Sequence, residues 1–364
     1  MMKKLFSILL PMAMVVAPAF AQTSTKLTAT KANEFGLMYT LPLTAFEVTV
    51  AVEKTVNTPG EFYQYAKKYL NTEPIIKPST SWRITEAVVN PVAVADEEER
   101  YLANFKGGTG TFMMLSDSNY PLSINDENYN PEVSLTELPK AVAAEPTVLQ
   151  KPIAQQAITP EMIQSKSSAK RAELAAEKIY ELRTNRNEII SGQADAMPSD
   201  GAAMKLALDQ LAGQEEALTA MFLGTVQKSV EVRTYTVYIP EDGEASRMVI
   251  ARLSAIDGLV DANDLSGDPI YIEITPITRG ELPVNEKGVA KTFPKGGVAY
   301  RIPGAAWVSL TYDDRTLTEK EFDVAQYGVV FGLDPSLFTN KREPAYLHFN
   351  PLTGAVRELG TVGN

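Results

Sequence analysis

The 364-residue chain contains no cysteine and only one histidine, His348. Without cysteine there is no disulfide, no thiolate nucleophile, no thiolate metal site and no lipidated cysteine. A single histidine also excludes a histidine-rich zinc site, since catalytic zinc usually has two or three such ligands. We therefore expect core packing alone to hold the fold, and the sequence predicts no metal site and no cofactor.

Basic residues are in the minority, with 34 Lys and Arg against 45 Asp and Glu and a net charge of −11. No long Lys/Arg run interrupts this acidity. Phosphate backbones and anionic lipids repel such a chain, so nucleic acid is not an expected partner.

The sequence has no apolar run long enough to span a membrane, and its first 21 residues contain a shorter apolar stretch. Two lysines precede an apolar stretch over residues 5–16, and Ala19-Phe20-Ala21 closes the segment. This order is typical of a cleavable signal peptide. The stretch is shorter than the roughly 20 residues that span a bilayer. We expect cleavage between Ala21 and Gln22. The mature chain, with no membrane-spanning segment, would reach the periplasm or the cell surface, where it could associate with the outer membrane.

Residues 22–130 are predicted to form an N-terminal α+β domain. Apolar side chains at Phe46, Val48, Val50 and Val52 alternate with polar or small ones, which indicates a strand with one buried face. On this basis Val50→Asp should unfold the region, and Thr49→Asp should be tolerated.

A helix is expected to follow this strand. Thr58 and Glu61 have the spacing of a capping box, Pro59 stands at the first helical position, and Asn71 is the expected left-handed end.

Three further strands are predicted around residues 82–89, 101–105 and 111–115. The last two flank a glycine-rich turn, Lys106 to Gly110, and should pair as a hairpin. This segment lacks the Gly-Lys-Ser/Thr ending of a phosphate loop, so it is interpreted as a turn.

The middle of the chain changes character twice. Residues 131–158 carry repeated prolines and are predicted to be a linker or a strap across the surface. Residues 159–225 are predicted to form a helical hairpin, with helices ending at Gly192 and Gly224. The first helix should start at Thr159-Pro160-Glu161. Its apolar stripe contains Ala172, Ala175, Ala176, Ile179 and Leu182.

Residues 226–364 are predicted to form a β-rich C-terminal domain, an antiparallel sandwich or curved sheet. Strands 230–239 and 248–253 should pair across a turn, and further turns are expected at 313–314 and 350–354. The fold class is therefore α+β.

Two motifs suggest nucleophilic catalysis and fail on inspection. Ser167 and Lys170 have serine–lysine spacing, but Ser116-Asp117-Ser118 and Lys291-Thr292-Phe293 differ from the companion motifs of penicillin-recognising enzymes. A solvated helix surface is expected there. His348 occupies an ordinary strand position, and no Gly-x-Ser-x-Gly elbow accompanies it, so a structural role is predicted.

Two other groups are weighed as binding sites. The loop from Asp261 to Asp268 is rich in oxygen ligands, but Leu265 and Ser266 break the calcium-loop pattern, so a turn is preferred. A sugar-stacking platform is an alternative to core packing for four aromatic residues, namely Tyr63, Tyr65, Tyr69 and Trp82. The many acidic residues leave carboxylate-pair catalysis open, and no catalytic residue is singled out.

Several segments resemble a known family. Tyr39-Thr40-Leu41-Pro42, Pro198-Ser199-Asp200-Gly201 and Tyr300-Arg301-Ile302-Pro303-Gly304 are similar to segments of the Bacteroidota family catalogued as domain of unknown function 4831. The similarity covers nearly the whole mature chain. The resemblance implies an exported envelope protein and brings no activity with it.

The resulting hypothesis is an exported envelope protein that is a non-enzymatic binding or structural protein. The helical hairpin is its expected partner contact, and the partner is another envelope protein or a glycan. The alternatives are a secreted glycan hydrolase that uses two carboxylates and a carbohydrate-binding module.

Overall fold

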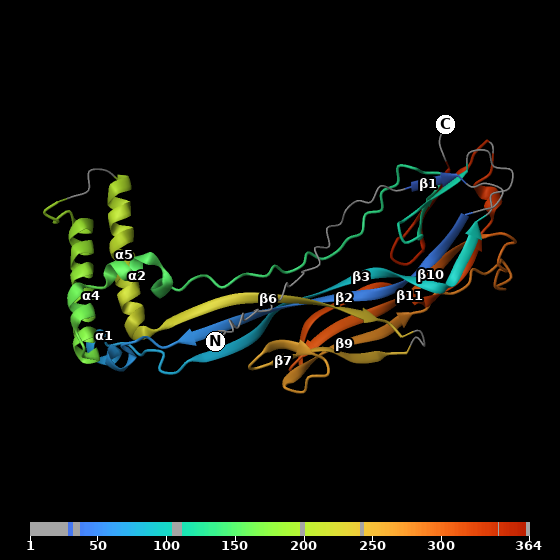
Figure 1. Cartoon of the computed structure of the whole chain (residues 1–364). Helices are drawn as coiled ribbons and strands as arrows, with labels where there is room; N and C mark the ends of the chain where they lie inside the picture. The colour runs from blue at the N-terminus through green and yellow to red at the C-terminus, as the bar shows by residue number, and fades with distance from the viewer. Residues whose placement is uncertain are drawn as a thin grey trace, which may run out of the picture.

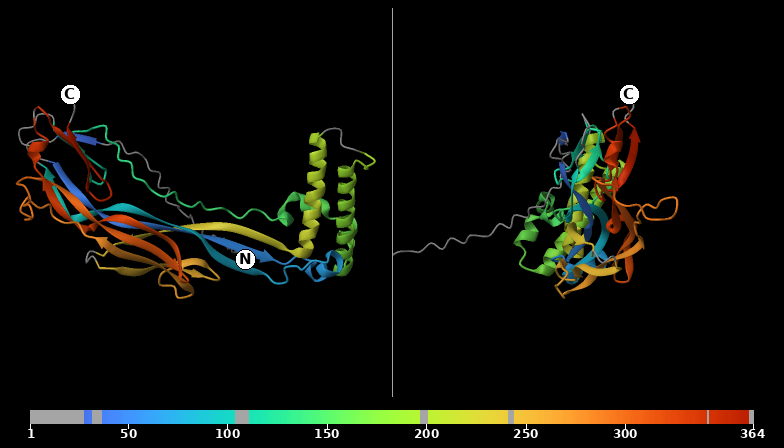
Figure 2. Two further views of the ribbon diagram at one scale, coloured as in Figure 1. Left: turned by 180° about the vertical axis from the view of Figure 1, so that it is seen from behind. Right: turned by 90° about the vertical axis from the view of Figure 1, so that its right-hand side faces the viewer.

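The computed structural model describes residues 28–31, 37–103, 111–196, 201–240, 244–340 and 342–361. The predicted signal segment and its cleavage position lie outside these residues. The molecule is elongated: a helical head and a β-rich body are joined by a long sheet, the stalk (Figures 1 and 2). Within the described part, no helix is both long and apolar enough to cross a membrane.

The stalk is the three-stranded antiparallel sheet β3-β2-β6. Its strands are β2 (Leu37–Thr58), β3 (Ser79–Ala103) and β6 (Thr225–Tyr238). At about 3.3 Å per residue, the 22 residues of β2 extend roughly 70 Å. The strands predicted at 82–89 and 101–105 are thus one continuous strand, β3.

Two sheets complete the body. One has the order β11-β10-β9-β7-β8 and the other β1-β4-β5-β12-β13. Their strands are β1 (Thr28–Lys31), β4 (Phe112–Leu115), β5 (Pro121–Ile124), β7 (Ser246–Ser254), β8 (Gly258–Asp261), β9 (Gly267–Thr278), β10 (Val298–Tyr312), β11 (Arg315–Leu333), β12 (Ala345–Phe349) and β13 (Val356–Thr361).

Two hairpins predicted from turn signals are wrong, the one between strands 101–105 and 111–115 and the one between strands 230–239 and 248–253. β3 pairs with β2, whereas β4 pairs with β1 and β5, and the predicted turn lies outside the described residues. Likewise β6 pairs with β2, whereas β7 pairs with β8 and β9. In each case the chain crosses from the stalk sheet to another sheet. The turns predicted at 313–314 and 350–354 do join paired strands, β10–β11 and β12–β13.

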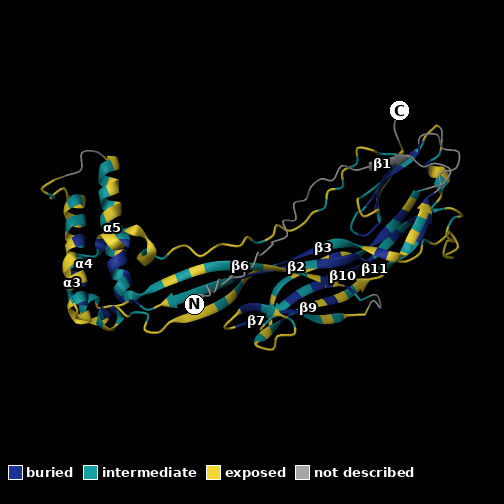
Figure 3. Ribbon diagram, in the orientation of Figure 1, coloured by how far each residue is buried: buried dark blue, intermediate teal, exposed yellow. Residues whose placement is uncertain are grey.

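The main core lies between the stalk sheet and the β9–β10 face, as the buried strand segments in Figure 3 show. Phe46, Val48, Val50 and Val52 are fully buried there, which confirms the face predicted from their alternation. They pack with Ile270, Ile272, Ile274, Ala306, Val308 and Leu310.

Thr49 was expected on a face that tolerates Asp, and its burial contradicts that expectation. It points to the opposite face of β2, yet its exposed fraction is only 1%. Beside it on that face, Asn90 exchanges two hydrogen bonds with the backbone of Thr136, at 2.9 and 2.8 Å. Thr136 belongs to residues 125–147, the strap, so the second face of β2 is covered as well. A buried carboxylate at position 49 would therefore not be tolerated.

The strap confirms the extended chain predicted from the prolines, although only over its first part. It runs along the stalk and forms an isolated bridge between Val142 and Val230 (Figure 1). The rest of the predicted linker, after the strap, forms η2 (Val148–Gln150) and α2 (Pro152–Ala157). Proline at the first position of α2 supports the helix start.

The head contains the predicted hairpin, α4 (Ser168–Ser191) and α5 (Gly201–Leu223). The five residues of the α4 stripe are all buried, and Gly192 ends α4 at φ +73°, as predicted. Thr159 caps only a short helix, α3 (Pro160–Gln164), and Ser167 caps α4 separately.

The helix predicted after Thr58 is much shorter than expected. Thr58 is the last residue of β2, and Glu61 pairs with Arg171 instead of closing a capping box. Only η1 (Tyr63–Tyr65) and α1 (Ala66–Leu70) form, and Asn71 adopts the left-handed conformation expected of it.

Candidate functional site

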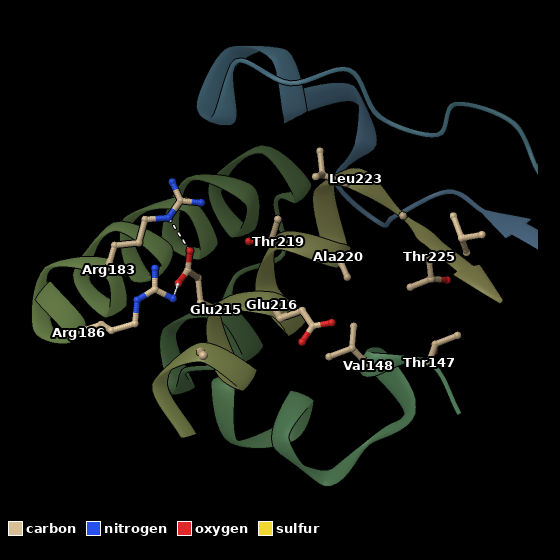
Figure 4. A pocket seen from close by; sticks show the side chains of 13 residues that line it. Thr147, Val148, Arg183, Arg186, Glu215, Glu216, Thr219, Ala220, Leu223 and Thr225 are labelled. Atoms are coloured by element: carbon tan, nitrogen blue, oxygen red, sulfur yellow. Dashed lines mark hydrogen bonds and ion pairs between the residues drawn. The ribbon is translucent and has the colours of Figure 1, made fainter. Parts of the chain in front are cut away.

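A cavity of about 490 Å³ opens where the head, the strap and the stalk meet (Figure 4). Its position follows from the chain path, because α5 ends at Leu223 and only Gly224 separates it from β6. Val148 of η2 and its N-cap Thr147 close the side of the cavity opposite the arginines. The walls combine apolar and polar side chains: Thr147, Val148, Arg183, Arg186, Ala212, Glu215, Glu216, Thr219, Ala220, Leu223, Thr225 and Val226.

One wall of the cavity is an ion-pair cluster across the hairpin. Arg183 and Arg186 lie three residues apart on α4, so they share a helix face. Arg183 Nε is 2.6 Å from Glu215 Oε1, and Arg186 is 2.6 Å from Glu215 Oε2. Glu215 is largely buried, with 13% of its side chain exposed. Both carboxylate oxygens are thus engaged, which fixes the register of α4 against α5.

Glu216 gives the cavity a second, differently placed carboxylate. Figure 4 shows it directed away from the arginines, toward Val148. It is exposed, and it forms no ion pair with any residue that the structure describes. The cavity thus offers an available carboxylate beside apolar walls, which suits a positively charged group with an aliphatic stem.

Sequence reasoning did not identify this cluster. The available signal was the Arg183-x-x-Arg186 spacing on one helix and the Glu215-Glu216 pair on the other. Periodicity places these side chains on helix faces, but it does not give the relative register of two helices.

The Ser167–Lys170 spacing has a structural explanation. Ser167 Oγ accepts the backbone N–H of Lys170 at 3.4 Å as the cap of α4. Lys170 Nζ lies 3.1 Å from Glu173. The serine is therefore used in capping, and the lysine ammonium pairs with a carboxylate.

The acidic loop after β8 is a hydrogen-bonded turn. Asp264 accepts the N–H of Ser266 at 2.9 Å, and this bond lowers the pKa of Asp264 below its usual range. Arg252 donates to the carbonyl oxygens of Ala262 and Gly267, at 2.8 and 3.1 Å.

The four aromatic residues considered as a sugar platform do not all come together, because Trp82 lies apart from the tyrosines. Tyr65 and Tyr69 pack against the head core. Trp82 belongs to the stalk, packs against the main core and donates its indole N–H to the carbonyl of Ile256 at 3.2 Å.

His348 lies in a polar cluster on β12. Its Nε2 is 2.8 Å from Asp126 and its Nδ1 3.3 Å from Glu358. Its ring stacks on Tyr129, with centroids 3.9 Å apart. These contacts fasten the start of the strap to the sheet of β12.

These features define an elongated α+β protein in which a β body and a stalk present a helical head with a cavity lined by apolar and polar side chains. The chain belongs to the family described as Domain of unknown function (DUF4831), whose model matches residues 35–357. No match is found among curated proteins or solved structures.

Proposed function

We propose that this protein is an exported, non-enzymatic interaction protein of the cell envelope whose head contacts the partner. One observation carries the proposal: the stalk enters the head directly. β6 follows α5 after Gly224 alone, and β2 runs into η1. β2 and β6 are paired over 14 residues, so the end of this pairing in the body lies roughly 45 Å from the head.

The outer part of the hairpin supports a contact role. Buried residues end at Leu182 on α4 and begin at Ala217 on α5, so residues 183–191 of α4 and 201–216 of α5 contain none. Ile190 and Leu206 are 65% and 63% exposed. These two exposed apolar side chains are taken as part of the proposed contact surface.

The proposed export rests on the signal-like sequence of residues 1–21. An exported protein would lie in the envelope, either in the periplasm or on the outside of the cell. Mass spectrometry of the native protein should find Gln22 as the first residue. Recovery of intact Met1 in the cytosol would contradict export.

A photo-cross-linking residue tests the contact. Placed at Ile190 or Leu206 in the full-length protein, it should give one discrete adduct in living cells. The control position is Ile256, which is 80% exposed outside the head. Glu216→Arg should reduce the adduct without changing the melting temperature. Equal labelling from Ile256, or none from the head, would contradict the proposal.

The glycan alternatives make a different prediction. A carboxylate-based hydrolase requires two carboxylates about 5–9.5 Å apart beside the bound sugar. Incubation of the purified protein with polysaccharides, followed by a reducing-end assay, tests that activity separately from the head contact.

A further inference from the structure

We infer that the outer face of β9 and β10 binds a non-acidic glycan, with Trp307 as the stacking ring. This site lies on the body and does not depend on the proposed contact of the head. Trp307 is 41% exposed on β10, a strand whose neighbours Ala306 and Val308 are buried. Within the described residues, its indole forms no hydrogen bond or ring contact.

A groove of about 450 Å³ lies on the same face. Trp307 is opposite Thr275 on β9, and Ser309 and Thr311 are opposite Glu273 and Tyr271. Because side chains of alternate residues share a face, this row leads from Trp307 into the groove. Tyr271 is roughly 13 Å from Thr275 along β9, at about 3.3 Å per residue. The groove residues are Arg247, Asp268, Pro269, Tyr271, Glu273, Thr311, Asp313 and Asp314.

The groove is lined by groups suited to sugar hydroxyls. The guanidinium carbon of Arg247 is 4.0 Å from the Tyr271 ring centroid, so the ring orients its planar donors. Carboxylates accept hydroxyl hydrogens, and guanidinium groups donate to hydroxyl oxygens. Four carboxylates against one guanidinium leave an excess of negative charge. Acidic polysaccharides would be repelled, which favours neutral or amino sugars.

The surroundings of Trp307 favour a sugar over a protein partner. Protein interfaces place their aromatic anchors in well-packed, desolvated centres. Here the cross-strand neighbours of Trp307 are Thr275 and Glu321, which are both exposed and polar. A sugar ring has an apolar C–H face bordered by hydroxyls, which matches one aromatic ring in a polar field.

The two tryptophans of the chain allow a direct test. In full-length Trp82→Phe, Trp307 is the only indole emitter. The probes are cello-, manno- and chito-oligosaccharides and chitosan hexamer, with polygalacturonate as the acidic comparison. We expect saturable quenching by at least one non-acidic probe and none by polygalacturonate. Titration calorimetry on the unmodified protein should give the same affinity, which guards against damage from Trp82→Phe.

Variants of the unmodified background locate the site. Trp307→Ala should weaken binding roughly tenfold or more, and Tyr271→Ala should also weaken it. The control is Leu265→Ala, at a position that is 82% exposed and outside the groove. The inference is overturned by absence of binding to every probe, by affinity unchanged in Trp307→Ala, or by preference for polygalacturonate. If no glycan bound and Trp307→Ala instead lost a protein partner, the inference would be overturned and the face would be a protein-binding surface.

Discussion

Thr49 lies on the central strand of the stalk with its hydroxyl 2.9 Å from that of Thr234. Thr49→Asp would bury a carboxylate in this site, and we expect a loss of more than about 2 kcal/mol in unfolding free energy. Thr49→Val removes only the hydrogen bond and should cost about 1 kcal/mol. Urea denaturation measures both. Thr80→Asp on exposed β3 is the control; an equal effect there would contradict the burial argument.

The alternation of residues 46–52 predicted the inner face of β2 because a packed sheet imposes a period of two. It did not predict the burial of Thr49. That burial comes from the strap, whose proline-rich sequence has no helix or strand periodicity. The strap is anchored by Asn90, which lies 46 residues from its partner Thr136 in the sequence.

Glu358 provides a pH-dependent readout at the surface. It accepts the phenol hydrogen of Tyr346 at 2.7 Å, and this bond, helped by His348, lowers the pKa of Glu358. A lowered pKa stabilises the fold above the ordinary value of 4.5, and that stabilisation is lost as pH falls through the folded-state pKa.

Tyr346→Phe should therefore raise the pKa of Glu358, as followed by NMR titration of its carboxyl carbon. The stability difference from the unmodified protein should be present above pH 4.5 and vanish in stronger acid. An unchanged pKa would show that the phenol is not the cause.

At the scale of elements, the junction between α5 and β6 depends on one glycine. Gly224 has φ +89°, and a Cβ there would lie 2.3 Å from the Thr58 carbonyl oxygen. Gly192, at φ +73°, has no atom within 4 Å of such a Cβ. Gly192→Ala should cost about 1 kcal/mol from backbone strain alone. Gly224→Ala should cost clearly more. Equal melting temperatures for the two variants would contradict a close approach.

Which strands pair was less predictable than which segments are strands. Local turns such as Asp313-Asp314 were predictable because two left-handed residues join adjacent strands. The contact of β5 with β12 joins residues more than 200 apart, and short alternating strands carry no label for such partners. The candidate cavity depends on the same kind of long-range register, so its residues were not found together.

For the whole molecule, continuous strands from body to head predict an extended particle in solution. A compact chain of this length has a radius of gyration of about 20 Å. The roughly 70 Å reach of β2 requires a clearly larger value. Small-angle scattering on the purified protein should give a radius well above about 20 Å and an asymmetric distance distribution. A value close to that of the compact chain would mean that the head folds back, and would remove the basis for a head held away from the body.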